Sequence, residues 1–310
     1  MKKILILSIV FLSSCDSRDR VNAVLSDATR NRLIEYRVWT PVNGNEKHPL
    51  VLLSHGSGGE FSNHNWLIES LVENGYVVAA ANHPFNTTGD NTNAGIISVW
   101  DRPADMSRLL DSVLADQTWS IDENRIGAAG FSSGGYTVLA LAGAEYDQAL
   151  LSDYCISDDH GPDCDLAGPA TGVDFSNSSL SYRDERVKAV FAMAPAVGAA
   201  ITEASLESIR VPVFIIAASD DELVYPTYNA IRYHKHIASS SLELLPGGGH
   251  FIFLQCNFVI RIVDWFNEDL DLCGRAFEVD RARVRQSVAA KAIDFFSGSL
   301  GFGSEAVELN

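Results

Sequence analysis

Short apolar runs alternate with amphipathic stretches along most of the chain, and this alternation limits the possible folds more than any other feature. The runs are rich in β-branched residues and nearly continuous. The expected strands are 50–53, 76–81, 125–131, 187–193, 211–217 and 242–245, and the expected helices are 65–73, 103–115 and 134–143. Such an order predicts an α/β fold whose central sheet is mostly parallel and covered by helices on both faces. Segment 33–40 alternates apolar and polar residues, so we expect it to begin an antiparallel edge.

Composition narrows the classes of function. The 310 residues include 23 Lys and Arg against 40 Asp and Glu, which gives a formal net charge of −17. A nucleic-acid binder needs a clustered cationic surface, and here the basic residues are scattered, so nucleic acid is not expected as a partner. With 46% hydrophobic and 20% charged residues the chain is ordinary for a globular protein, and its length suits one large α/β domain or two small ones.

The first 14 residues read as an export signal. Lys2 and Lys3 precede an apolar run from Ile4 to Leu12, which is too short to span a bilayer. The following Leu-Ser-Ser-Cys resembles the lipobox of bacterial lipoproteins, which implies cleavage before Cys15 and acylation of that residue. We therefore expect an exported protein, attached to a bacterial membrane through the lipid on Cys15 and facing the periplasm or the exterior. The alternative is an ordinary signal peptide cut elsewhere, and the choice between inner and outer membrane stays open.

Four further cysteines follow, and export makes disulfides the expected state of these thiols. They are Cys155, Cys164, Cys256 and Cys273. Of the three possible connectivities, pairing each cysteine with its neighbour in sequence closes the shortest loops and is favoured. No C-x-x-C spacing supports a zinc or redox site, and we expect neither a metal nor a cofactor.

Gly130-Phe131-Ser132-Ser133-Gly134 matches the pattern G-x-S-x-G. It directly follows an expected strand and directly precedes a helix of small residues, which is the strand–turn–helix setting of a nucleophile elbow. Glycines are needed on both sides because the turn is sharp and a side chain would collide with the neighbouring strand or helix. Ser132 is therefore the candidate nucleophile.

A serine hydroxyl needs a base to take its proton, and the base needs an orienting carboxylate. Strand 211–217 runs into Asp220 and Asp221, and strand 242–245 runs into a glycine-rich loop that ends at His250. The resulting order of Ser, Asp and His along the chain is that of α/β-hydrolases. We prefer Asp221 as the acid, with Asp220 as the alternative.

Two backbone N–H groups are expected to form an oxyanion hole. The residue after the nucleophile, Ser133, supplies one of them. The loop 54–59, Ser-His-Gly-Ser-Gly-Gly, follows an earlier strand, and its Ser57 is the candidate for the other. This loop matches neither of the glycine-rich phosphate-binding motifs, so a nucleotide is not expected.

Four segments together identify a family. They are 54–59, 100–105 (Trp-Asp-Arg-Pro-Ala-Asp), 127–135 and 245–251 (Leu-Pro-Gly-Gly-Gly-His-Phe). The set resembles the predicted dienelactone hydrolases related to platelet-activating-factor acetylhydrolase, over roughly 33–300. The resemblance implies an α/β-hydrolase fold and a cofactor-free serine esterase. Position 132 holds Ser where dienelactone hydrolase itself has Cys, and segment 192–195 has no carboxylate where the acetylhydrolase has its acid, which again favours Asp221.

The function predicted from the sequence is a serine hydrolase that cleaves carboxylic esters through an acyl-enzyme. Short-chain esters, polyesters, phospholipid acetyl esters and peptides remain open as substrates, with peptides least favoured. A catalytically inactive envelope lipoprotein of the same fold is the alternative, and the oligomeric state stays open. The expected domain organisation is a signal at 1–14, a tether at 15–32, a hydrolase domain at 33–300 with an insertion around 145–185 as a candidate lid or pocket wall, and a tail at 301–310.

Overall fold

A computed structural model describes residues 20–42, 46–166, 168–256, 261, 272–273 and 279–302. Cys15, the expected signal 1–14 and residues 303–310 of the expected tail lie outside the described residues. None of the helices that the structure describes is both long and apolar enough to span a lipid bilayer.

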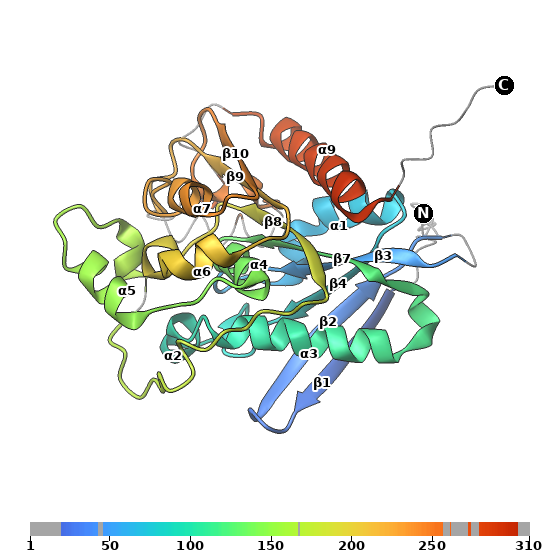
Figure 1. Ribbon diagram of the computed structural model, residues 1–310, viewed down its shortest axis with the longest axis horizontal. Helices are drawn as coiled ribbons and strands as arrows, with labels where there is room; N and C mark the ends of the chain where they lie inside the picture. Colours follow the sequence, from blue (N-terminus) through green and yellow to red (C-terminus); the bar gives the residue numbers. More distant parts are fainter. Residues whose placement is uncertain are drawn as a thin grey trace, which may run out of the picture.

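An eight-stranded sheet forms the centre of the molecule (Figure 1). Its strands are β1 (Arg20–Asp27), β2 (Arg32–Trp39), β3 (His48–Ser54), β4 (Val77–Asn82), β7 (Ile121–Phe131), β8 (Val187–Met193), β9 (Val213–Ala218) and β10 (Ser240–Leu245). They lie in the order β1-β2-β4-β3-β7-β8-β9-β10. The pairs β1·β2 and β2·β4 are antiparallel, and every later pair is parallel. The expected α/β class with a mostly parallel sheet is confirmed.

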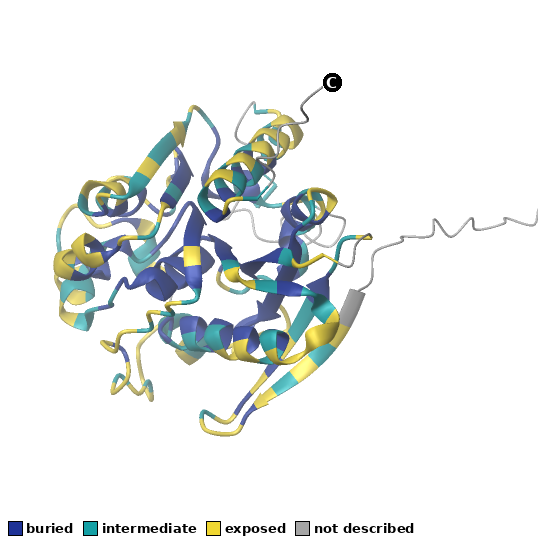
Figure 2. Cartoon of the chain, turned by 45° about the vertical axis from the view of Figure 1, so that its right-hand side comes forward, coloured by how far each residue is buried: buried dark blue, intermediate teal, exposed yellow. Residues whose placement is uncertain are grey.

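Helices cover both faces of this sheet. The helices are α1 (Asn65–Glu73), α2 (Asn93–Ile97), α3 (Asp101–Ala115), α4 (Ser133–Ala142), α5 (Gln148–Cys155), α6 (Glu203–Ser208), α7 (Ala230–His236) and α9 (Arg281–Leu300). On one face α9 packs against α1, β7 and β8, and on the other α4 packs against α3, β3, β7 and β8 (Figure 1). Buried residues are concentrated in the parallel strands between these layers, and the exposed residues lie mainly on the outer sides of the helices (Figure 2).

The amino-terminal end of the sheet differs from the prediction. Segment 33–40 is antiparallel as expected, but it is not the edge, because β1 pairs with β2 along its whole length. The predicted tether at 15–32 is therefore wrong from Arg20 onward. A tight turn joins the two strands, in which the carboxylate of Asp27 accepts hydrogen bonds from the backbone N–H of Thr29 and from Nε of Arg30.

The segment around 145–185 interrupts the alternation between α4 and β8, as the sequence indicates. It contains α5 and the 3₁₀ turn η3 (Pro162–Asp165). Cys155 is bonded to Cys164 within it, and Cys256 is bonded to Cys273 elsewhere. Both bridges have the sequence-local connectivity that the spacing favours.

Short elements complete the chain. A small hairpin of β5 (Asn86–Thr87) and β6 (Asp90–Asn91) follows β4. The remaining 3₁₀ turns are η1 (Phe61–His64), η2 (Gln117–Trp119), η4 (Gly198–Ala200) and η5 (His250–Phe253). The loops after β3, β4, β7, β8 and β9 all leave the sheet at the carboxyl edge of its parallel strands, and this edge carries the candidate site.

Candidate active site

Ser132 lies at the sharp turn between β7 and α4. Its backbone has φ 56° and ψ −120°, a conformation that is costly for any residue with a side chain and is typical of a nucleophile elbow. A Cβ atom on Gly130 would lie 2.1 Å from the carbonyl oxygen of Gly134, and one on Gly134 would lie 2.0 Å from that of Ser54. Backbone therefore occupies the space where side chains would stand, which explains both glycines of the motif.

His250 joins Ser132 to Asp221. Nε2 of His250 lies 2.9 Å from Oγ of Ser132, and Nδ1 lies 2.7 Å from Oδ2 of Asp221. The pattern fits an imidazole that donates its Nδ1–H to the carboxylate and accepts the hydroxyl proton at Nε2. All three residues are buried, and Ser132, with 8% of its surface exposed, is the most accessible of them.

The two neighbouring aspartates have different surroundings. Oδ1 of Asp221 accepts hydrogen bonds from the backbone N–H groups of Leu223 (3.1 Å) and Val224 (2.8 Å), so that its other oxygen is directed at His250. Asp220 is exposed, and its carboxylate accepts from the hydroxyl of Ser219 at 3.2 Å. Of these two candidates, Asp221 is the one in contact with the histidine.

The loop after β3 passes directly beside Ser132. A Cβ on Gly56 would lie 3.3 Å from Cβ of Ser132. Asn86, in β5, fixes the outer side of this loop, because its Oδ1 accepts from Oγ of Ser57 at 2.8 Å and from the backbone N–H of Gly58 at 2.7 Å. Within the described chain, the backbone N–H groups of Ser57 and of Ser133, the first residue of α4, have no hydrogen-bond acceptor. Both sequence-predicted amides thus lie free on segments that flank Ser132.

Two aromatic side chains support the segment of His250. Trp66, on α1, donates from Nε1 to the carbonyl of Phe253 at 2.9 Å and so fixes η5, which begins at His250. The rings of Phe131 and His250 pack at 4.9 Å between centroids. Trp66 thus supports the segment that carries His250.

The insertion contacts the segment that follows β4. The side chain of Asn93, at the start of α2, accepts from the N–H of Gly168 at 2.5 Å and donates to the carbonyl of Pro169 at 2.7 Å. Tyr146 forms a β-bridge with Ile201, which ties the beginning of the insertion to the loop after β8. The insertion therefore lies next to the loops that carry the candidate site.

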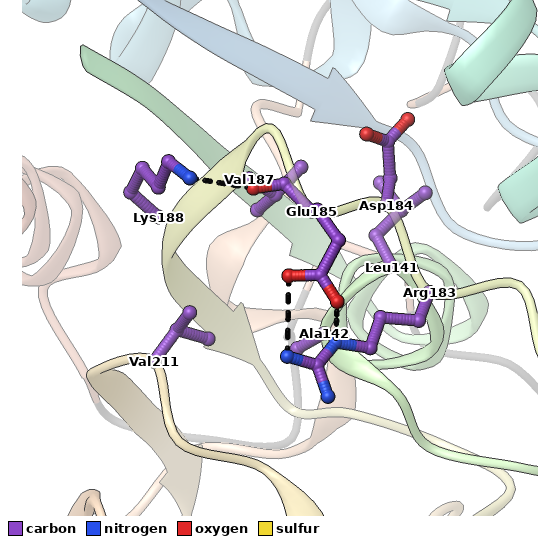
Figure 3. A pocket seen from close by; sticks show the side chains of 8 residues that line it. All are labelled: Leu141, Ala142, Arg183, Asp184, Glu185, Val187, Lys188 and Val211. Atoms are coloured by element: carbon purple, nitrogen blue, oxygen red, sulfur yellow. Dashed lines mark hydrogen bonds and ion pairs between the residues drawn. The ribbon is translucent and has the colours of Figure 1, made fainter. Parts of the chain in front are cut away.

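A small hollow of about 60 Å³ lies away from this site (Figure 3). Leu141 and Ala142 line it from the last turn of α4, together with the ion-paired Arg183 and Glu185. Because Ser132 precedes the first turn of the same ten-residue helix, the two places are about 15 Å apart along its axis. The hollow belongs to the amino edge of the sheet, and none of the predicted site residues lines it.

Sequence reasoning missed a buried polar network beneath the loop after β3. It contains Arg102 and Asp105 of α3 and His83, which follows β4. Helix α3 begins at Asp101, whose carboxylate pairs with Arg32 at 3.2 Å. An Arg and an Asp three residues apart on the apolar face of this helix are the signal that could have indicated a buried network.

In the part of the chain that the structure describes, no cluster of His, Cys, Asp and Glu has the geometry of a metal site.

The comparisons with known proteins establish the fold. No protein-family model matches the sequence, and no curated protein matches it. Among solved structures, a ferulic acid esterase from Streptomyces cinnamoneus is 19% identical with a TM-score of 0.60, the match covering 91% of this chain and 89% of that one. Est1E from Butyrivibrio proteoclasticus is 14% identical with a TM-score of 0.52, covering 89% and 99%. A puromycin-hydrolyzing peptidase from Mycobacterium tuberculosis is 14% identical with a TM-score of 0.58, covering 94% of this chain and 41% of the peptidase. The chain therefore has the α/β-hydrolase fold.

Proposed function

We propose that the chain is a serine hydrolase that cleaves carboxylic esters through an acyl-enzyme. The observation that carries the proposal is the series of hydrogen bonds from Ser132 through His250 to Asp221. Ser132 lies on a strained elbow next to two backbone N–H groups that have no acceptor among the described residues. A scaffold protein has no requirement for this combination, and backbone strain of this kind is concentrated at functional sites.

The geometry supports the following mechanism. Ser132 attacks the ester carbonyl while Nε2 of His250 accepts the hydroxyl proton, and Asp221 stabilises the imidazolium through Nδ1. The backbone N–H groups of Ser57 and Ser133 donate to the oxygen on which negative charge develops. His250 then protonates the leaving alkoxide, and a water molecule activated by the same base releases the acid and restores the serine.

Esters are favoured over peptides by the extent of the structural matches. The two esterases are covered over 89% and 99% of their length, whereas only 41% of the puromycin-hydrolyzing peptidase is matched. The finer assignment to relatives of platelet-activating-factor acetylhydrolase rests on the sequence motifs alone, and within it the acyl-chain length stays a prediction to be tested.

A fluorophosphonate probe and p-nitrophenyl butyrate test the proposal together. We expect the probe to label the wild-type protein at Ser132 and the ester to be hydrolysed, and we expect Ser132→Ala to lose both activities while remaining folded. A folded wild-type protein that is neither labelled nor active would instead indicate the inactive envelope lipoprotein. Hydrolysis of the p-nitroanilide at a rate equal to that of the matched ester would point to a peptidase.

We also propose that the mature protein is exported and held at a bacterial membrane by a lipid on Cys15. The support is the charged, then apolar segment 1–14 followed by that cysteine. Acylation of this cysteine is expected to provide the anchor. Metabolic labelling with a palmitate analogue should mark the wild-type chain and not Cys15→Ser, and the variant should move from the membrane to the soluble fraction. Unchanged membrane attachment of Cys15→Ser would contradict this proposal.

A further inference from the structure

Arg102 is a charged side chain buried directly beneath the candidate active site. It is the second residue of α3 and is 1% exposed. Burial lowers the pKa of its guanidinium to about 9, so the group still carries its charge at neutral pH. A buried charge of this kind is retained only where its hydrogen bonds hold something in place or where it acts on a nearby charge.

One arm of the guanidinium reaches the loop after β3. Nη2 donates to the backbone carbonyl of His55 and lies 3.4 Å from Oγ of Ser54. The peptide unit that begins with this carbonyl ends at the N–H of Gly56, and the next N–H along the chain is that of Ser57. Arg102 therefore fixes the loop immediately before one of the two candidate oxyanion donors.

The other arm reaches the nucleophile elbow. Nε of Arg102 donates to Oγ1 of Thr137 at 3.2 Å, and this hydroxyl donates to the carbonyl of Ser133 at 2.8 Å. Ser133 carries the other candidate oxyanion donor, on the first turn of α4. One guanidinium thus connects the two backbone segments whose N–H groups must converge on the same oxygen atom.

A second chain of hydrogen bonds fixes Ser54, another partner of Arg102. Oγ of Ser54 lies 2.9 Å from Nε2 of His83, and Nδ1 of His83 lies 3.0 Å from Oδ2 of Asp105. Arg32 completes the chain with a bond of 2.7 Å from Nη2 to the same carboxylate oxygen. Ser54, His83 and Asp105 repeat the residue types of the candidate triad, but all three are fully buried and cannot meet a substrate. Their hydrogen bonds join β3, the residue after β4 and α3 beneath the loop.

We propose that Arg102 is a positioning residue for ester hydrolysis, which holds the Ser57 and Ser133 segments at the separation that the oxyanion requires. The inference rests on the proposed function, and Arg102 itself does not touch the substrate. Oxyanion donors act only when they lie within about 0.5 Å of their working position, and a displacement of about 1 Å can cost about 100-fold in rate.

The test compares Arg102→Met and Thr137→Val with the wild-type enzyme on p-nitrophenyl butyrate. For Arg102→Met we expect kcat to fall about 10- to 100-fold with KM within about twofold, because the binding of the uncharged ester does not depend on the oxyanion donors. Affinity for a trifluoromethyl ketone, whose adduct with Ser132 carries the oxyanion, should fall by the same factor. Thr137→Val removes only the hydroxyl between Arg102 and Ser133, and we expect a smaller loss of kcat in the same direction. The pH dependence of kcat/KM should be unchanged in both, since neither side chain touches His250 or Asp221.

Arg186→Met serves as the matched control. Arg186 also joins several segments, bonding Asp184, Asp111 and the carbonyl of Ser107, but it lies near the other end of α4. This variant should lose stability without losing kcat. Should Arg102→Met fail to fold, Thr137→Val carries the test. A folded variant with wild-type kcat and ketone affinity would overturn the inference, as would a rise in KM alone. If the wild-type enzyme is neither labelled by the fluorophosphonate nor active, the proposed function is overturned, and the inference with it.

Discussion

Asp221 and Asp220 are adjacent in sequence and differ in what each carboxylate meets. Asp221 is 4% exposed and bonded to His250, while Asp220 is exposed to solvent. We expect Asp221→Asn to lower kcat by about 10²- to 10⁴-fold, because the amide no longer stabilises the imidazolium and favours the wrong tautomer. Asp220→Asn should stay within about twofold of the wild-type rate. Steady-state kinetics of the two variants decide the matter, and a larger loss in Asp220→Asn would refute the assignment.

His64 is a buried histidine that the proposed mechanism does not use. Its ring is fully buried, neither ring nitrogen has a hydrogen-bond partner among the described residues, and burial lowers its pKa from 6.5 to about 3. Between pH 6.5 and 3 the unfolded chain binds a proton at His64 that the folded protein does not. The free energy of unfolding therefore decreases as the pH falls through that range.

Replacement of this ring by an apolar side chain should therefore protect the fold in acid. We expect His64→Leu to gain about 2–3 kcal/mol of unfolding free energy at pH 4.5, relative to the difference between variant and wild type at pH 7. Urea unfolding at the two pH values measures both differences. Equal differences at pH 7 and pH 4.5 would contradict a neutral buried ring.

At the residue scale, the sequence was sufficient for the groups that occur in motifs. Ser132 and His250 follow strands and lie in glycine-rich turns, so their places at the carboxyl edge could be predicted. The partners of Arg102 and His83 could not be predicted, because they lie 47 and 22 residues away, respectively. The local Arg and Asp pattern of α3 indicates burial but not these partners. The glycines around Ser57 indicate its N–H as a candidate oxyanion donor, whereas the support of this loop by Asn86 is visible only in three dimensions.

The nucleophile elbow is the element whose packing tolerates least change. A Cβ on Gly134 would lie 2.0 Å from a backbone oxygen of β3, and neither segment can move without displacing the sheet. We therefore expect Gly134→Ala to prevent folding or to separate Ser132 from the loop after β3.

Gly298, in α9, provides the matched control for that substitution. Nothing lies within 4 Å of a Cβ at this position, and its helical backbone accepts alanine. Gly298→Ala should raise the free energy of unfolding by about 0.5–1 kcal/mol. Circular dichroism and thermal unfolding of both variants test the pair, and a stable, fully active Gly134→Ala would show that the elbow is not packed as described.

At the element scale, the parallel strands were predictable and the sheet's antiparallel end was not. The inner strands bury both faces, so that Leu50 to Leu53 form a continuous apolar run with no exposed surface. In β1 the exposed Val24 breaks the expected alternation, and only its pairing with β2 identifies the segment as a strand. Helix α9 was omitted from the prediction although Val288, Ala292, Phe296 and Leu300 recur every four residues and are buried.

At the scale of the whole molecule, the net charge is −17, and the segments around the candidate site are acidic. The loops after β3, β4, β8, β9 and β10 are 55–64, 83–100, 194–202, 219–229 and 246–256. Together with residues 145–182 of the insertion they contain Asp and Glu but no Lys or Arg, and Arg183 near the end of the insertion pairs with Glu185. The carboxyl edge of the sheet is therefore expected to have a negative potential that attracts cations and repels anions.

This distribution predicts the charge preference of the enzyme. At low ionic strength we expect kcat/KM for an ester with a quaternary ammonium group to exceed that for an isosteric carboxylate-bearing ester by about 10-fold or more. The ratio should shrink above about 0.1 M salt, where the Debye length falls to about 10 Å. An equal or reversed preference, or one insensitive to salt, would show that the acidic loops do not govern access to Ser132.

The central claim, that the protein hydrolyses esters through a covalent intermediate on Ser132, is tested most directly by trapping that intermediate. Rapid acid quenching during turnover of p-nitrophenyl acetate, followed by peptide mass spectrometry, should show one acetyl group on the peptide that contains Ser132, and His250→Ala should accumulate none at the same time points. An enzyme that turns over the ester with no acyl group on Ser132, or with the group on another residue, would contradict the mechanism.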